Sequence, residues 1–293
     1  MKFRAHETFS IRKGWLHKGI KGIINNPRLF VDKNINAQDE LGIGSNMVKS
    51  LRYWLQATGL TKEVIGKGMS LTEIGKIIWK YDEYFEEDGT LFLIHYMLSS
   101  NLEMATSWYL VFNEIKSKNI SKKDFFDYVK YYVQEKSDNK LPSERVLNDD
   151  FECLIKTYYN SKEYSDPENN FSSPLSELGL ITISADELNK DGKVYLKTSP
   201  KRTLSPYLIL AIIINEANKH GLGKEIRIAS LETDKCNIGR TFNLDNILIS
   251  NYLDKLQNMD LIKVVRTAGL DVIRLKTDLT FENCVQKYYE SIK

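Results

Sequence analysis

The chain has 293 residues, enough for two or three packed modules, because single domains usually run to roughly 100 to 200 residues. Hydrophobic residues make up 42% of it and charged residues 27%, a balance that excludes disordered and fibrous proteins. The net charge of +2 is unevenly divided, since residues 1–68 hold 12 Lys and Arg against 5 Asp and Glu. This asymmetry favours a module that meets a polyanion, although a merely basic surface would give the same count.

The spacing of the cysteines and the length of the apolar stretches indicate where in the cell the protein is expected. Cys153, Cys236 and Cys284 are far apart and form no CxxC pair, so neither a zinc site nor a disulfide framework is indicated. The first residues lack an apolar run of signal-peptide length, and the stretch Leu208 to Ile214 is too short to span a bilayer. We therefore expect a cytoplasmic protein with no membrane partner.

The first 81 residues predict a helix-turn-helix followed by a wing. Apolar spacing indicates helices over 15–26 and 37–41, then a turn at 42–44 and a third helix from Ser45, as its cap, to about Thr58. Residues 60–65 and 69–71 flank a glycine-containing turn and predict a hairpin, and 72–81 return to helix.

The rest of the chain predicts a helical middle and a second winged-helix module. Helical periods cover 89–117, 121–134, with a capping-box-like start at Ser121 and Asp124, and 143–159, and the polar stretch 160–173 is the expected linker. Further on, the pattern predicts helices over 203–220, 244–259 and 280–292, and a hairpin of 261–265 and 271–275 around Thr267, Ala268 and Gly269. The expected fold is mainly α with small β hairpins, in modules 1–81, 82–165 and 174–293.

The helix that starts at Ser45 is the candidate DNA-reading element. With Val48, Leu51 and Leu55 on its apolar face, the helical period places polar side chains on the other side. Lys and Arg serve guanine or phosphate, Asn and Gln serve adenine, and the helix N-terminus offers amide donors. The expected contacts are Ser45, Asn46, Lys49, Arg52, Tyr53 and Gln56, with Arg12, Lys13 and Lys18 from the basic N-terminal stretch. The alternative is a solvated face.

The corresponding helix of the second module offers little to a phosphate backbone. Residues 244–259 expose mainly Asn and Asp, with Lys255 as the cation nearby. We expect a structural or oligomerisation role there, with Arg240 and Arg266 as the obvious phosphate contacts.

The stretch FRAHETFSIRKGWLHKG, residues 3–19, concentrates polar chemistry beside aromatic residues. His6 and Glu7 could supply a general base and a metal ligand for phosphodiester cleavage, while Arg4 could neutralise the developing charge. The alternative is a buried Arg4–Glu7 ion pair that fixes the first helix. Glu7 and Asp150, the second of two adjacent aspartates, are the candidate Mg²⁺ ligands. No nucleotide-binding, dinucleotide or zincin motif is present in the sequence.

Six segments together resemble one bacterial family, the domain-of-unknown-function family DUF4007. They are FRAHETFSIRKGWLHKG (3–19), LGIGSNMVKSLRYW (41–54), SLTEIGKIIW (70–79), HYMLSSNLEMATSWYLVFN (95–113), SSPLSELGLI (172–181) and GRTFNLDN (239–246). The resemblance implies a protein of a phage-defence system that introduces phosphorothioates into DNA. It further implies a Mg²⁺-dependent nickase that opens one strand for sulfur, beside a cysteine desulfurase, an ATPase and a PAPS-reductase-like protein. A homodimer is one possible oligomeric state of the chain.

Two other functions remain open from the sequence. The protein could be a non-catalytic DNA-binding module that recruits the modification complex, or a protein adaptor without DNA affinity. Nicking, binding without nicking, and the absence of binding distinguish the three hypotheses.

Overall fold

The computed structural model describes residues 1–136, 140–160, 172–189, 192–267 and 270–293. The chain forms two compact units, Met1–Lys201 and Arg202–Lys293. Both are mainly helical with small antiparallel sheets, which confirms the coarse fold class expected from the sequence. The winged-helix arrangements and the division into three modules stay predictions. Most of the predicted linker lies outside the described residues.

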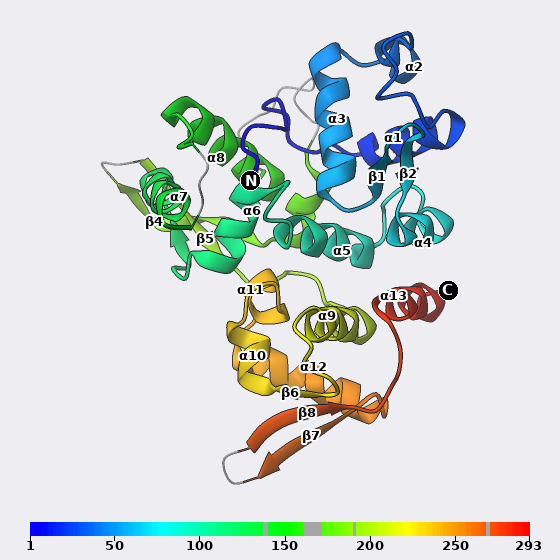
Figure 1. The fold of residues 1–293 in the computed structure, drawn as a ribbon. Coiled ribbons are helices and arrows are strands. Elements are labelled where there is room, and N and C mark those ends of the chain that lie inside the picture. Colours follow the sequence, from blue (N-terminus) through cyan, green and yellow to red (C-terminus); the bar gives the residue numbers. More distant parts are fainter. Residues whose placement is uncertain (137–139, 161–171, 190–191, 268–269) are drawn as a thin grey trace. The chain divides into compact units, whose positions relative to one another are not determined.

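Three helices open the first unit, in the predicted order: α1 (Trp15–Asn25), α2 (Ala37–Leu41) and α3 (Ser45–Ala57) (Figure 1). Gly42, in the left-handed conformation at φ 60°, ends α2 and turns the chain toward α3. Helices α1 and α3 pack closely at Gly19, where a Cβ atom would lie 2.7 Å from a methyl of Leu55. The absence of a side chain at Gly19 therefore sets the spacing of the two helices.

A hairpin of β1 (Thr61–Val64) and β2 (Gly68–Leu71) follows α3 and leads into α4 (Glu73–Tyr81). The Met69 amide donates to the Pro27 carbonyl at 2.7 Å and ties the hairpin to the loop after α1. Thr72 caps α4, and a Cβ at Gly75 would lie 2.1 Å from the Leu60 carbonyl oxygen. The hairpin is therefore fixed at both of its ends.

The helical middle comprises α5 (Asp88–Ser99), α6 (Thr106–Tyr109), the π-helical turn η1 (Leu110–Glu114), α7 (Lys122–Lys136) and α8 (Glu144–Tyr158). The helical period predicted over 89–117 is interrupted after Ser99, where the Asn101 side chain accepts from the Met104 amide at 3.0 Å. Ser121 and Asp124 form the reciprocal hydrogen bonds expected at the start of α7.

A three-stranded sheet, which the sequence pattern does not predict, completes the first unit. Its order is β3 (Asn119–Ile120), β5 (Gly192–Lys197) and β4 (Ile181–Asn189), all antiparallel, and the short helix η3 (Pro174–Leu178) precedes β4. Lys197 is buried, and its Nζ donates to the carbonyls of Val111 at 3.0 Å and Ile115 at 2.5 Å. The ammonium group thus caps the end of η1.

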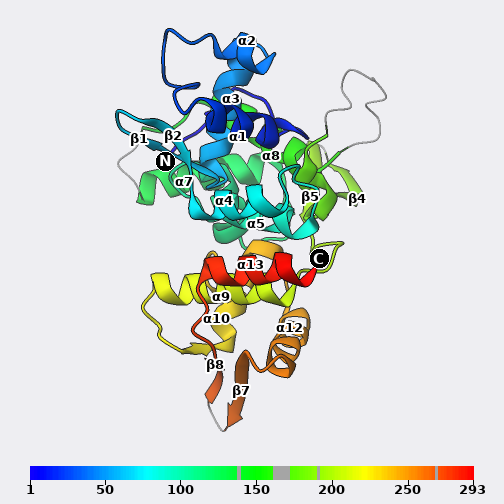
Figure 2. The same ribbon diagram turned by 90° about the vertical axis from the view of Figure 1, so that its right-hand side faces the viewer.

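The second unit packs α9 (Pro206–Lys219) against α13 (Phe281–Ser291), which lie side by side in Figure 2, and against α12 (Asn246–Asn258). Its sheet has the order β6 (Glu225–Arg227), β8 (Leu270–Leu275) and β7 (Ile262–Thr267), with α10 (Ile228–Thr233) and α11 (Ile238–Phe242) between β6 and α12. The predicted β7–β8 hairpin is present, and residues 268–269 of its turn lie outside the described residues. No helix in the described part of the chain could cross a membrane.

Candidate functional site

The N-terminal segment before α1 has an unusual backbone. Arg4, Glu7 and Thr8 have positive φ angles of 57°, 49° and 68°, a region that residues other than glycine rarely adopt. The Phe9 amide donates to the His6 carbonyl at 2.9 Å, so the segment curls into a turn. Because such conformations cost free energy, contacts elsewhere must hold the segment in place.

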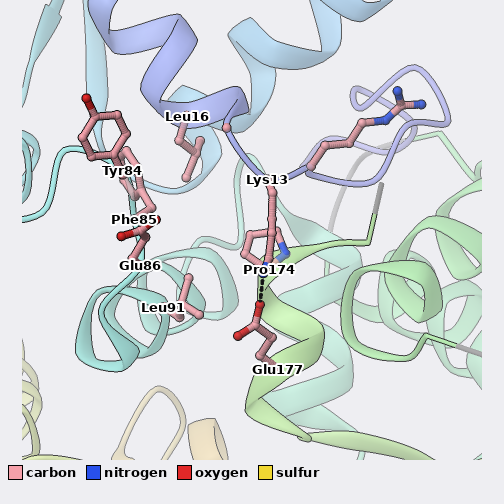
Figure 3. Close-up of a pocket in the computed structure, with 10 residues that line it drawn as sticks. Lys13, Leu16, Tyr84, Phe85, Glu86, Leu91, Pro174 and Glu177 are labelled. Carbon is pink, nitrogen blue, oxygen red and sulfur yellow. Dashed lines mark ion pairs between the residues drawn. The ribbon is translucent and has the colours of Figure 1, made fainter. Parts of the chain in front are cut away.

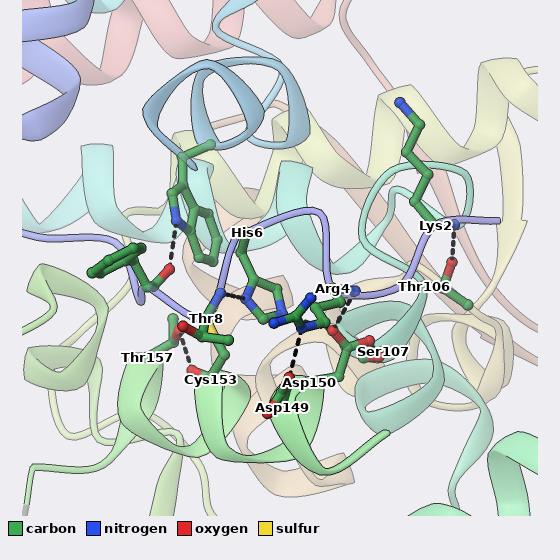
Figure 4. Close-up of polar contacts among 12 residues, drawn as sticks. Lys2, Arg4, His6, Thr8, Thr106, Ser107, Asp149, Asp150, Cys153 and Thr157 are labelled. Carbon is green, nitrogen blue, oxygen red and sulfur yellow. Dashed lines mark hydrogen bonds and ion pairs between the residues drawn. The ribbon is translucent and has the colours of Figure 1, made fainter. Parts of the chain in front are cut away.

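Asp150 of α8 supplies those contacts at the centre of a group that we call the N-terminal polar cluster: Arg4, His6, Ser107, Asp149, Asp150 and Cys153 (Figure 4). Oδ1 of Asp150 accepts from the Arg4 amide and lies 2.7 Å from Nε2 of His6, and Oδ2 accepts from the Ser107 hydroxyl at 2.6 Å. Only 1% of Asp150 and 1% of His6 is exposed. The carboxylate therefore joins the segment to α8 and α6.

The Arg4 side chain pairs with Asp149 rather than with Glu7. Its Nε lies 2.6 Å from Oδ2 of Asp149, and the pair is partly exposed. The alternative interpretation, a buried ion pair of Arg4 with Glu7, is therefore wrong, because the partner of Arg4 is Asp149. A buried pair does fix the N-terminal segment, but it is formed by His6 and Asp150.

The imidazole of His6 is subject to opposing influences. Burial lowers its pKa, whereas Cys153 and Asp150 raise it, and the balance raises the pKa of His6 to about 10. The Thr8 amide donates to Nδ1 at 3.1 Å and needs the lone pair of that nitrogen. A pKa of about 10 favours the doubly protonated imidazole at neutral pH, whereas this contact requires an unprotonated Nδ1 and therefore a neutral ring. Protonation of His6 would displace the Thr8 amide, so the charge of His6 and the conformation of residues 6–8 are coupled.

The N-terminal polar cluster does not fit a Mg²⁺ ion. The oxygens of Asp150 already take three contacts, and Asp149 is paired with a guanidinium. Mg²⁺ prefers several oxygen ligands, including waters, in octahedral geometry. Glu7 is half-exposed, and among the residues that the structure describes no three His, Cys, Asp or Glu side chains gather as a metal site would require. The predicted Glu7–Asp150 metal site thus has no support, and the catalytic roles of Arg4, His6 and Glu7 stay predictions.

The cations that follow this segment border a cavity of about 300 Å³ at the start of α1 (Figure 3). Lys13 pairs with Glu177 of η3 at 2.5 Å, and the Arg12 guanidinium lies over the rings of Phe9 and Trp15 at 5.5 and 5.2 Å. Burial lowers the pKa of Arg12. Because Glu86 and Glu177 also line the cavity, its charge is balanced, and it does not favour an anion.

Helix α3 presents most of its predicted polar residues to solvent. Ser45, Asn46 and Lys49 are exposed, and Arg52 and Gln56 are half-exposed. The cap is Gly44, one residue before the predicted Ser45, and it forms no side-chain hydrogen bond to the helix. Among the described residues, no side chain accepts from the first amides of α3, at Ser45 and the two residues after it.

Tyr53 is a correction to the predicted face. The helical period placed it with the polar residues, but it is only 6% exposed, and its ring lies 6.2 Å from the His6 ring and 5.2 Å from the Trp54 ring. Burial, with Asp150 and Cys153 nearby, raises the pKa of Tyr53 well above its ordinary value. Tyr53 therefore belongs to the packing around the N-terminal polar cluster and not to a DNA-facing surface.

Several predicted DNA-contacting cations make contacts within the chain. Arg52 pairs with Glu63 of β1 at 2.6 Å and donates to the Phe30 carbonyl at 3.3 Å. Lys18 donates to the Leu41 carbonyl at the end of α2 at 2.9 Å. In the second unit, Arg240 of α11 donates to the Thr233 carbonyl at 3.2 Å. Arg52 and Lys18 thus position the hairpin and α2 around α3.

The comparisons agree with the resemblance found in the sequence. The model of a family described as protein of unknown function, DUF4007, matches residues 3–289, so the chain belongs to the DUF4007 family. Two crystal structures of SspB are similar to this chain over 99% of its length with 25% identity. The magnesium ion-bound SspB has a TM-score of 0.84 over 88% of the SspB chain, and the other has 0.81 over 87%. No curated protein matches the chain in sequence.

Proposed function

We propose that this protein is a DNA-binding component of a bacterial phage-defence system that introduces phosphorothioates into DNA, and that α3 contacts duplex DNA. Membership of the DUF4007 family and the likeness to SspB support the system. The observation that carries DNA binding is the exposed, uncapped N-terminal half of α3. In this proposal α2, α3 and the β1–β2 hairpin act together as a winged helix.

The chemistry of α3 suits a phosphate backbone. Its first amides point out of the helix end, where the helix dipole favours an anion. Lys49 lies one turn further along and is exposed, with its Nζ 3.3 Å from the Asn46 side-chain oxygen. Asn46 and Gln56 add side chains that can hydrogen-bond adenine. A phosphate at the helix end would therefore meet amide donors and one exposed cation.

Fluorescence anisotropy with a 20-base-pair duplex at several salt concentrations tests this proposal. We expect Lys49→Ala to weaken binding about 3- to 10-fold and to reduce the salt slope by about 0.9, the value for one released counterion. Lys123→Ala is the matched control, because Lys123 is an exposed lysine near the start of α7. Equal effects of the two substitutions would refute a role for α3 in DNA binding. If no duplex binds near physiological salt, the hypothesis of a protein adaptor without DNA affinity would be favoured instead.

Nicking of one DNA strand is the second candidate function, and it rests on the likeness to the magnesium ion-bound SspB. The assay is conversion of supercoiled plasmid to the nicked form, with Mg²⁺ and with EDTA. Nicking that needs Mg²⁺ and is lost in Glu7→Gln, with duplex binding retained, would support an enzyme that uses this carboxylate. Binding without nicking would instead assign a recruiting role beside the desulfurase, the ATPase and the PAPS-reductase-like protein that the family resemblance implies.

A further inference from the structure

Three aromatic rings form a continuous stack in the first unit. The ring of His17 on α1 lies between Tyr84, at 4.7 Å and 18° between planes, and Trp79 of α4, at 5.2 Å and 27°. Nδ1 of His17 lies 3.0 Å from the Glu83 carbonyl, which can only accept, so Nδ1 donates. This hydrogen bond and the two neighbouring rings fix the imidazole, and His17 in turn supports one side of the Trp79 indole.

Trp79 differs from the other tryptophans in exposure. All four lie within the described residues, and Trp15, Trp54 and Trp108 are buried, with 6%, 0% and 1% of their surface exposed, whereas Trp79 is only partly buried. Burial of the other three is the usual state of so large an apolar side chain in a folded unit. The part of the Trp79 indole that His17 leaves uncovered is thus available to a ligand.

Trp79 also lines a pocket of about 610 Å³ whose other residues come from the end of α1, the hairpin and α4. Ile24, Met69 and Leu71 contribute apolar surface beside Trp79, and Lys62 and Lys76 bring two ammonium groups to the same pocket. The volume lies within the usual range of about 300 to 1,000 Å³ for small-molecule sites.

The electrostatics of the pocket favour an anionic ligand with an aromatic part. Glu73 is the one acidic side chain among the described residues that line the pocket, and Lys76 holds it at 2.7 Å in an exposed ion pair. Its hydrogen bond to Lys76 lowers the pKa of Glu73, so it is ionised, and the pocket keeps a net charge of one positive unit. Exposed pairs of this kind are weak, and a phosphate can compete for Lys76. Lys62 stands opposite Ser70 in the hairpin register, which adds a hydroxyl near the second cation.

We propose that this pocket binds an unpaired base of a DNA strand, stacked on Trp79, with the adjoining phosphates at Lys62 and Lys76. Aromatic stacking combined with flanking cations is the general means by which proteins hold single strands without reading sequence. The inference rests on the proposed DNA-binding function and adds to it a second contact, since α3 would face the duplex. The protein would thereby hold a strand that has been locally opened.

Intrinsic tryptophan fluorescence of the full chain tests this proposal. A twelve-residue oligothymidylate is titrated into the protein at low salt, and the 20-base-pair duplex and thymidine 5′-monophosphate are titrated in parallel. We expect the single strand to quench the emission of Trp79, and Trp79→Phe to remove the quench. In anisotropy, Trp79→Ala should weaken single-strand binding about 10-fold, within the range for loss of one stacked base.

Charge variants provide a control that does not depend on the indole. The double substitution of Lys62→Gln with Lys76→Gln should reduce the salt slope for the single strand by about 1.4, at roughly 0.7 per phosphate contact. Lys80→Gln removes one charge from α4, one turn beyond Lys76 and outside the pocket lining, and should leave the slope nearly unchanged, whereas Lys76→Gln alone should lower it by about 0.7. If Trp79→Ala fails to fold, Trp79→Phe and the lysine variants still decide the question.

The outcomes separate this inference from the proposed function. Duplex binding without single-strand binding would overturn the pocket assignment and leave the α3 proposal intact. Single-strand binding with a quench that persists in Trp79→Phe would place the strand elsewhere, and equal affinity for thymidine 5′-monophosphate would replace the strand by a free nucleotide. If neither DNA form binds, both proposals fail together.

Discussion

Replacement of Asp150 by alanine gives the sharpest test of the N-terminal polar cluster. The substitution removes the acceptor of the buried groups of His6 and Ser107 and of the Arg4 amide. Each buried donor left unpaired costs about 1 to 3 kcal/mol, and the loss of one partner of a buried pair costs about 3 to 5 kcal/mol. We therefore expect Asp150→Ala to lower the free energy of unfolding by about 3 to 5 kcal/mol. The corresponding fall in Tm is about 6 to 20 °C, at roughly 2 to 4 °C per kcal/mol.

The neighbouring Asp149 is a matched control, because it holds only the Arg4 side chain in a partly exposed pair. Asp149→Ala should cost about 1 kcal/mol or less. The measurement is urea unfolding followed by circular dichroism, with the same slope required of each variant. If Asp150→Ala does not accumulate as folded protein, Asp150→Asn replaces it, because asparagine keeps an acceptor oxygen. The free energy of unfolding of Asp150→Asn should be lower than those of the wild type and of Asp149→Ala. Equal costs for the two alanine variants would refute the reasoning.

Three further predictions concern thiols, a close backbone contact and a buried lysine. Cys153 and Cys284 are buried, and burial raises the pKa of Cys284 to about 12. A disulfide reagent at pH 8 should therefore label Cys236 rapidly and the other two cysteines slowly. Rapid labelling of a second cysteine would contradict this prediction. Gly75→Ala should destabilise by about 2 to 3 kcal/mol in urea, because its Cβ would meet the Leu60 carbonyl, while Gly44→Ala, with open space around it, should cost about 1 kcal/mol or less. Lys197→Met should cost about 2 to 4 kcal/mol, because it leaves the carbonyls of Val111 and Ile115 without their donor. Lys193→Met, at an exposed position of the same strand, should cost little, and equal Tm values for the two variants would exclude the cap.

Local patterns predicted the helices well and the second sheet poorly. The helices α1, α2 and α3 and the first hairpin begin and end within a few residues of their predicted bounds, because apolar period, glycine and turn residues all act locally. The sheet of β3, β5 and β4 joins residues 119–120 to residues 192–197, and such a pairing leaves no local sequence signal. The break after Ser99 was also missed, because it depends on the Asn101 side chain in an otherwise helical period.

The candidate site shows the same limit. The sequence singled out Arg4, His6 and Asp150 by chemical type, and the structure brings these three residues together. The sequence alone does not show that Asp150 is buried and accepts from three donors, or that Ser107 is one of these donors. The contacts join residues more than 40 positions apart. The period places Tyr53 on the wrong face for a related reason. A second packing partner widens the buried stripe of α3, which takes in Ser50, Tyr53, Trp54 and Ala57 besides the predicted Leu51 and Leu55.

The long reach of the N-terminal segment has a consequence for folding during synthesis. The Arg4 amide and its acceptor Asp150 are 146 residues apart, so this bond cannot form until most of the first unit has left the ribosome. Helices α1 to α3 and the hairpin hold local contacts and can assemble earlier. We therefore expect the strained turn at residues 4–8 to wait, unfolded, for α8 to be translated, and the start of the chain to be among the last parts of its unit to acquire native structure.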